Sequence, residues 1–253
     1  MTLQPTTLDA AQRRSLLGRV SPLVKLGVAA AWLLGLATTV DPRPGLLLAA
    51  AALAAIPTLG AVPRDRVVRR LWPLLLAGLG IALTNLLFSA SNADPSATEL
   101  LRLGPLRLTA EGAATALGLG SRVLAIVAVG AAFALTTEAT GLADALVQQA
   151  GLSPRFAYGA LAAYQAVPRL ADDLGTLRAA RRLRGLREWH PRILVGLLVR
   201  AIRHADQLAL AMDARAFGTG PRTTYRPMRW GIADVVVGVA GLGLLVVALV
   251  ALR

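Results

Sequence analysis

Residues 113–137 read AATALGLGSRVLAIVAVGAAFALTT, and Arg122 is the one charged side chain in this apolar run. The run exceeds the roughly 20 residues that a helix needs to cross the hydrocarbon core of a bilayer. Alanine, leucine, glycine and valine dominate it, as is common in transmembrane helices. The stretch therefore predicts a membrane-spanning helix. It leads directly into the most basic part of the chain.

The rest of the chain shares this apolar character. Hydrophobic residues make up 55% of the 253 residues but aromatic residues only 4%, and the mean hydropathy is +0.59. Such a composition is typical of transmembrane helices and unusual for a soluble protein of this size. We predict an all-α membrane protein with about five transmembrane helices. The other four expected spans are residues 23–40, 45–62, 71–90 and 231–252. We expect a turn at residues 41–44 and an interruption of the second span at Pro57.

Several classes of site and partner are excluded or made improbable by composition. The chain has no cysteine, so disulfides, thiolate metal ligands and cysteine nucleophiles are excluded. Its net charge of +13 is also found in nucleic-acid-binding proteins, but arginine in a membrane protein collects in cytoplasmic segments. We therefore expect no nucleic-acid partner. Residues 1–21 contain no apolar core, and we expect no cleavable signal peptide.

The distribution of arginine predicts the orientation in the cell membrane. Basic clusters precede the first span, follow the second span and fill the region between the fourth and last spans. All three lie on the cytoplasmic side if the N-terminus is cytoplasmic. The polar loop 91–111, with few arginines for its length, then lies outside. This gives a multi-pass protein with three parts: residues 1–137 with four transmembrane helices, residues 138–227 as a cytoplasmic block, and residues 228–253 with the last helix.

The cytoplasmic block is predicted to contain three helices. A short amphipathic helix covers residues 141–150. A second helix, with Ser153 as N-cap and Pro154 in its first turn, runs to about Arg187 and is expected to bend at Pro168. The sequence Trp189-His190-Pro191 breaks it, and a third helix covers residues 192–217. Apolar stripes on the two long helices predict that they pack on each other or on the membrane part. The stripe residues are Leu170, Leu174, Leu177 and Leu183 on the second helix, and Leu197, Ala201, Ala205, Leu208 and Met212 on the third.

An arginine between small or apolar residues stands near the end of each long helix. The first is Arg184, flanked by Leu183 and Gly185, and the second is Arg215, flanked by Ala214 and Ala216. A guanidinium is permanently charged, and its planar fork holds carboxylates or carbonyl oxygens in a fixed geometry. The repeated pattern favours docking of these arginines into another protein. The alternative is an anchor that binds lipid head groups of the bilayer.

In its sequence motifs the chain resembles the transmembrane T component of energy-coupling factor transporters, which are ABC-type importers of vitamins and transition-metal ions. That family carries two Ala-Arg-Gly-like motifs at the ends of two coupling helices, and residues 183–185 and 214–216 match them. Leu183 stands where alanine is usual, and Ala216 stands where glycine is usual. Residues 21–26, 104–112, 135–137 and 142–146 also resemble family stretches, so the resemblance covers nearly the whole chain.

The resemblance implies a membrane scaffold rather than an enzyme. Arg184 and Arg215 would each enter a groove on one of two cytoplasmic ABC-type ATPases, which bind ATP and Mg²⁺. A membrane-embedded S component would bind the substrate, a vitamin or a transition-metal ion. No catalytic, cofactor or metal site is implied for this chain. The sequence also lacks the Gly-x-x-x-x-Gly-Lys-Ser/Thr phosphate loop.

Two other functions compete with a scaffold. An intramembrane enzyme needs clustered carboxylates, histidines or a nucleophile. The adjacent pair Asp172-Asp173 is the nearest approach, and we expect it to pair with Arg169 or Arg178 on its own helix. A self-contained secondary transporter or channel needs polar residues within its spans. Arg122, with Asn85 as a potential partner on the third span, is the feature that favours this alternative.

Overall fold

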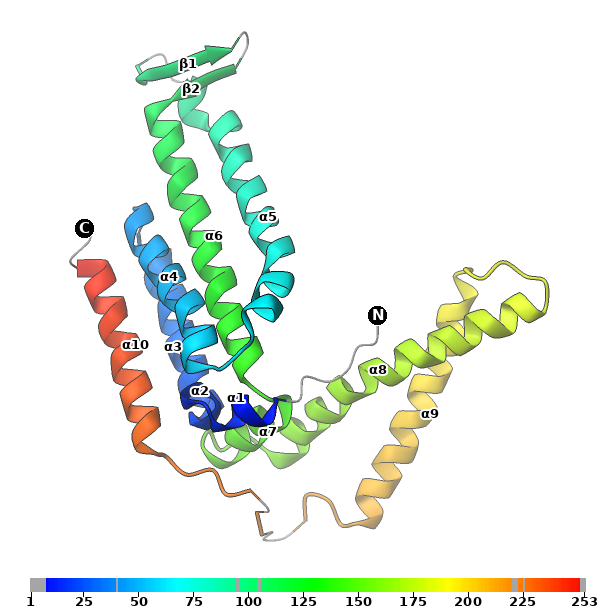
Figure 1. The fold of residues 1–253 in the computed structure, drawn as a ribbon. Helices are drawn as coiled ribbons and strands as arrows, with labels where there is room; N and C mark the ends of the chain where they lie inside the picture. Colours follow the sequence, from blue (N-terminus) through cyan, green and yellow to red (C-terminus); the bar gives the residue numbers. More distant parts are fainter. Residues whose placement is uncertain are drawn as a thin grey trace. The chain divides into compact units, whose positions relative to one another are not determined.

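The computed structural model describes residues 8–39, 41–93, 96–103, 106–219, 223–224 and 226–250. This part of the chain is almost entirely helical, as predicted, with one two-stranded hairpin (Figure 1). The elements in chain order are α1 (Ala10–Arg14), α2 (Leu16–Arg19), α3 (Pro22–Ala37), α4 (Pro42–Leu59), α5 (Arg64–Phe88), the 3₁₀ helix η1 (Ala90–Ala93), β1 (Glu99–Leu103), β2 (Leu106–Thr109), α6 (Ala110–Thr136), α7 (Ala139–Gln148), α8 (Pro154–Leu183), α9 (Arg192–Ala214) and α10 (Ile232–Val250).

The chain divides into two compact units. The bundle unit comprises residues 8–138 and the residues from 229 onward, and the arm unit comprises residues 139–228. The bundle unit therefore holds α1 to α6 and α10, whereas α7, α8 and α9 belong to the arm unit. The chain leaves the bundle after Glu138 and returns to it at Arg229.

Among the described residues, four helices are long and apolar enough to cross a bilayer. They are α4, the stretch Arg64–Asn92 that contains α5, α6 and α10. The fifth expected span, α3, is apolar but has only 16 residues, which at 1.5 Å per residue is about 24 Å. The helices of the arm unit do not meet these criteria, in keeping with their charge.

The main core lies where α3, α4, α6 and α10 meet. Trp32, Leu48, Val129 and Leu245 contribute one large side chain from each helix, and all are buried. The indole Nε1 of Trp32 donates a hydrogen bond to the carbonyl of Gly241 at 2.8 Å, which satisfies its polar atom within the apolar core. A second cluster around Ile56 and Leu71 joins α4 to α5 and α6.

Small residues let these helices approach closely. A Cβ on Gly45 of α4 would lie 2.7 Å from the Oγ of Ser121 on α6, and one on Gly241 would lie 2.6 Å from a methyl of Val28 on α3. Such spacing leaves no room for a side chain and is typical of helix packing in lipid. Several glycines of the spans therefore serve packing within the bundle, whereas a Cβ on Gly27, Gly80, Gly130 or Gly243 would meet nothing within 4 Å.

Two expectations were wrong because prolines of the second span act differently from the prediction. Residues 41–44 are not a turn: Asp41 caps α4, its Oδ1 accepts from the amide of Arg43 at 3.0 Å, and Pro42 opens the helix. Proline suits this first position because its missing N–H has no helical partner there. Pro57 does not interrupt α4, which continues to Leu59 with Ile56 fully buried. The helix that carries the third expected span, α5, begins at Arg64, ahead of Leu71.

The loop expected at 91–111 contains a β-hairpin. β1 and β2 pair antiparallel, with Leu101 opposite Leu108 and Arg102 opposite Arg107. The alternation of leucine and arginine in these residues is a period-two pattern that predicts strands. The polar composition of the segment, from which a loop was expected, does not reveal this pattern. Asn92 joins the hairpin to α5, because its amide donates to the carbonyl of Leu86 at 2.9 Å while its oxygen accepts from Thr109.

Arg122 does not pair with Asn85. Its guanidinium donates to the carbonyl of Thr39, just beyond the end of α3, whereas the amide of Asn85 donates to the carbonyl of Ile81 on its own helix at 2.9 Å. A cation at the carboxyl end of a helix is favoured by the helix dipole and by unpaired carbonyls. Arg122 therefore caps α3 from the neighbouring helix.

Candidate docking sites at two helix ends

Arg184 and Arg215 occupy the same position in two helices. Each is the C-cap residue, with φ −89° and ψ 8° for Arg184 after α8, and φ −92° and ψ 12° for Arg215 after α9. The second and third helices expected from the sequence thus end at Leu183 and Ala214, three or four residues earlier than predicted. The two arginines mark the helix ends themselves.

The two ends also share a hydrogen-bond pattern. After α8, the amide of Gly185 donates to the carbonyl of Arg182 at 3.0 Å, and the amide of Leu186 donates to that of Arg181 at 3.1 Å. This pair of bonds, five-to-two and six-to-one, defines a Schellman motif. It satisfies carbonyls that a helix end otherwise leaves unpaired.

After α9, the same two bonds recur. The amide of Ala216 donates to the carbonyl of Asp213 at 2.8 Å, and that of Phe217 donates to the carbonyl of Met212 at 3.0 Å. The Schellman motif requires a left-handed residue directly after the C-cap. Gly185 has φ +70° and Ala216 has φ +53°, so both positions meet this requirement. The small-Arg-small pattern in the sequence therefore encodes a helix end that presents an arginine.

The difference between Gly185 and Ala216 has a measurable cost. A left-handed conformation strains an alanine by about 1 kcal/mol relative to glycine. We expect Ala216→Gly to stabilise the end of α9 and Gly185→Ala to destabilise the end of α8, each by about 1 kcal/mol. Thermal unfolding of the purified chain, followed by circular dichroism, measures both. Opposite shifts of the midpoint are expected, and a lower midpoint for Ala216→Gly would contradict this geometry.

Neighbouring arginines shape the segment that follows Arg184. The Nε of Arg181 donates to the carbonyl of Arg187 at 3.0 Å, and Arg182 forms an ion pair with Glu188 at 2.9 Å. The guanidinium of Arg178 lies 5.4 Å from the ring centroid of Trp189, a cation–π distance. These side chains fold the connection back along α8. Arg184 itself is exposed and has no ion pair among the described residues.

Aromatic packing braces the segment that follows Arg215. The rings of Tyr158 and Phe217 meet edge to face with centroids 6.3 Å apart, and the Tyr158 hydroxyl donates to Asp144 of α7 at 2.7 Å. The side chain of Arg155 lies against Gly218, where an added Cβ would clash with its Nε. The start of α8 thus holds the residues just after the end of α9. No motif in the sequence indicates the contact between Tyr158 and Phe217.

Burial and the carboxylate of Asp144 raise the pKa of Tyr158 to about 12. Because the pKa is raised on folding, the Tyr158 contribution to stability is complete below pH 10 and is lost between pH 10 and pH 12. We expect an alkaline titration of tyrosine absorbance to show a late step that Tyr158→Phe removes. Asp144→Asn should shift that step to lower pH. A titration in which Tyr158→Phe leaves the late step intact would contradict the assignment.

α8 and α9 pack antiparallel through contacts spaced four residues apart. Arg200 of α9 forms an ion pair with Asp173 of α8 at 2.9 Å. One turn further along, Arg169 contacts the imidazole of His204 at 2.7 Å. The prediction that Asp173 pairs on its own helix was wrong. The antiparallel packing brings the opposite charges of Asp173 and Arg200 together across the two helices.

Part of the expected apolar stripes lines the same cavity as these polar contacts. Leu170 of α8 and Ala201, Ala205, Leu208 and Met212 of α9 line a cavity of about 240 Å³ between the helices. Leu183 is an exception, because it is 89% exposed. α8 also passes through Pro168 without ending. The two long helices therefore form one antiparallel hairpin within the arm unit.

This hairpin places the two arginines at opposite ends. Arg184 lies at the connection between the helices, and Arg215 lies at the other end of α9, beside the start of α8. The 23 residues of α9 at 1.5 Å each separate them by roughly 35 Å. They are therefore two separate sites with the same local geometry. Their guanidinium groups suit recognition of carboxylates or carbonyls on a partner.

Comparison with known proteins agrees with these features. The profile of the cobalt transport protein family CbiQ matches residues 13–225. An energy-coupling factor transporter transmembrane protein, EcfT, of Thermanaerovibrio acidaminovorans is 31% identical over 75% of this chain and 77% of its own length. The EcfT of Limosilactobacillus fermentum is 28% identical over 87% of both chains.

A further relative differs from the EcfT proteins in both length and name. A Bifidobacterium longum protein, whose name describes an ABC transporter ATP-binding protein, is 26% identical over 88% of this chain. The present chain spans 30% of the length of that protein. It spans most of the length of the two EcfT relatives.

Proposed function

The chain belongs to the CbiQ family of cobalt transport proteins and is a transmembrane T component, and from this premise we propose that it couples ATP hydrolysis to substrate uptake. In this proposal two ABC-type ATPases dock on the arm unit from the cytoplasm. A membrane-embedded S component binds the substrate, which is a vitamin or a transition-metal ion. The chain itself binds neither ATP nor substrate, and Mg²⁺ and ATP reside on the ATPases.

One observation carries the proposal: the arm unit presents the same arginine cap twice. Two copies of one partner require two equivalent docking points, and Arg184 and Arg215 share backbone angles, hydrogen bonds and a left-handed following residue. The separation of roughly 35 Å along α9 leaves each partner its own place on the hairpin. A lipid anchor would need positive charge but not this repeated geometry.

Sidedness follows from the same proposal. ATP is cytoplasmic, so the arm unit lies in the cytoplasm, and the odd number of expected spans places the two chain ends on opposite sides. The basic residues that precede α3 and those at the start of α5 then also face the cytoplasm, as the positive-inside rule favours. The hairpin β1–β2 lies outside.

The alternative of a self-contained channel or secondary transporter rests on Arg122. Its guanidinium donates to the carbonyl of Thr39 and thereby caps α3. A charge used in this way serves helix packing rather than a conduction path. The apolar lining of the bundle core also offers few polar anchors for a small solute.

The direct test is co-purification. The tagged chain is expressed together with the ATP-binding proteins and small membrane proteins encoded beside it. It is then purified in a mild detergent. We expect two ATPase subunits per chain in the purified complex, together with a membrane-embedded partner. Recovery of the chain alone under conditions that preserve a known transporter of this family would count against the proposal.

A further inference from the structure

Two buried charges lie in the bundle unit where the chain passes to and from the arm unit. The side chain of Lys25 on α3 is 8% exposed, and that of Asp234 on α10 is 4% exposed. Burial of a charge is costly unless hydrogen bonds and opposite charges compensate it. Both residues are compensated, and their partners all belong to helix ends.

Lys25 holds the last residue of α6. Its ammonium donates to the carbonyl of Thr136 at 2.7 Å and to that of Leu17 in α2 at 2.9 Å. Thr136 ends α6, and the chain leaves the bundle two residues later. The cation therefore sits at the negative end of the α6 dipole, where unpaired carbonyls accept hydrogen bonds.

Asp234 holds the starts of two helices. Its Oδ1 accepts from the amide of Ser21, the N-cap of α3, at 2.6 Å, and its Oδ2 accepts from the amide of Gly231 at 2.7 Å. Gly231 directly precedes α10, and the chain enters the bundle two residues before it. The anion thus lies at the positive ends of α3 and α10, which is the favourable arrangement.

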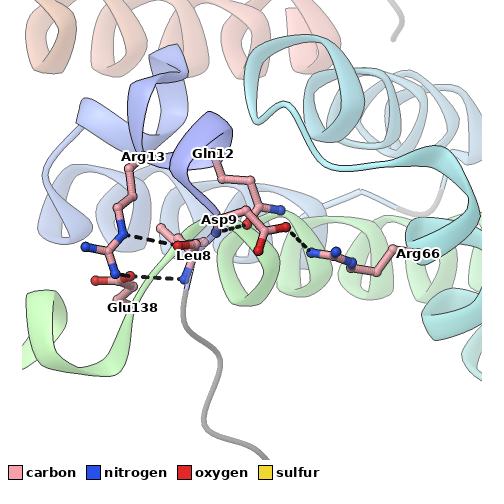
Figure 2. A network of polar contacts seen from close by, with 6 residues as sticks. All are labelled: Leu8, Asp9, Gln12, Arg13, Arg66 and Glu138. Atoms are coloured by element: carbon pink, nitrogen blue, oxygen red, sulfur yellow. Dashed lines mark hydrogen bonds and ion pairs between the residues drawn. The ribbon is translucent and has the colours of Figure 1, made fainter.

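The start of α3 therefore binds both bundle helices that are covalently connected to the arm unit, α6 and α10. Lys25 fastens the outgoing helix α6, and the backbone of Ser21 fastens the incoming helix α10. A second network lies close by in sequence, at residue 138. Figure 2 shows Glu138 bound to Arg13 at 2.8 Å and to the amide of Leu8, while Asp9 binds Arg66 of α5 at 3.0 Å. The segment before α3 thereby ties the exit of α6 to the start of α5.

We propose that Lys25 and Asp234 form a clamp that transmits movement of the arm unit to the bundle as a whole. The proposal rests on the proposed coupling function. Movement driven by the ATPases reaches the bundle along the chain through α6 and α10. Both helix ends are fixed to one turn of α3. The three helices α3, α6 and α10 therefore move together rather than separately. Lys25 and Asp234 are positioning residues and touch neither nucleotide nor substrate.

The test measures coupling in the reconstituted complex with its ATPases and S component. Lys25→Met keeps an unbranched side chain, shorter by one heavy atom, and removes the charge. We expect assembly and ATP hydrolysis to persist while the substrate imported per ATP hydrolysed falls by about tenfold or more, because the buried ammonium no longer binds the carbonyls of Thr136 and Leu17. Arg43→Met, at an exposed cation of α4, is the matched control and should leave this ratio unchanged.

A rescue experiment separates coupling from folding. The chain has no cysteine, so Ser21→Cys with Asp234→Cys introduces a single pair at neighbouring positions. The reduced protein should be uncoupled, and oxidation to the disulfide should restore import per ATP. Wild-type coupling in Lys25→Met, or no recovery on oxidation, would overturn the clamp. Failure of the wild-type chain to bind ATPases would instead overturn the proposed function.

Discussion

Replacing Arg184 and Arg215 together by alanine is expected to release the ATPases from the membrane and abolish uptake. Removal of one partner from a buried, hydrogen-bonded charge pair at an interface costs about 2–5 kcal/mol. At 1.4 kcal/mol per factor of ten, each loss weakens docking by roughly 30-fold to several thousandfold. Each single variant should therefore abolish uptake, because both ATPases must be engaged for turnover. The double variant should lose membrane-bound ATPase altogether.

The structure identifies which arginine serves as the control. Arg203 is an exposed residue of α9 with no ion pair among the described residues, so Arg203→Ala removes one positive charge without disturbing a helix end. Arg178 on α8 is a less suitable control, because its guanidinium stacks on Trp189 and its replacement would loosen the segment after Arg184. The measurement is the ATPase content of purified membranes. Wild-type ATPase content in the double variant would disprove docking through these arginines.

The local chemistry of the docking sites could be predicted only in part from the sequence. The two arginine patterns and the break at residues 189–191 are visible as short motifs, because helix ends are determined by neighbouring residues. The left-handed geometry of Ala216 is not visible, since alanine rarely adopts it and only the surrounding Schellman bonds impose it. The contact between Tyr158 and Phe217 also could not be predicted from the sequence, because it joins the start of α8 to the segment after α9, which are far apart along the chain.

The membrane part shows the same division. Apolar length alone located α4, α5, α6 and α10, because a span must satisfy its backbone internally and be about 20 residues long. Partners of buried polar residues could not be located in this way. Arg122 donates a hydrogen bond to a carbonyl just beyond the end of α3 rather than pairing with Asn85. Lys25 donates one to a carbonyl at the end of α6. Those pairings depend on which helices are neighbours, which periodicity does not specify.

Fusion of a reporter that is active only outside the cell should give an all-or-none pattern along the chain. With the N-terminus in the cytoplasm and five crossings, a fusion after Ser96 in the connection between α5 and β1 should be active. A fusion after Arg253 should also be active. Fusions after Arg70, in the first turns of α5, and after Thr223, in the arm unit, should be silent. Activity in whole cells, corrected for the amount of fusion protein, is the measurement.

The short helix α3 raises a question that the fusions after Ser96 and Arg253 do not answer. α3 has 16 residues and α4 has 18, and the two are consecutive. If this pair dipped into the bilayer without crossing it, two crossings would be lost, and the later fusion points would keep their sides. A further fusion after Asp41 decides this, because it is active only if α3 crosses fully. Activity after Thr223 has a different meaning: it would place the arm unit outside, away from ATP, and both docking arginines would lose their role.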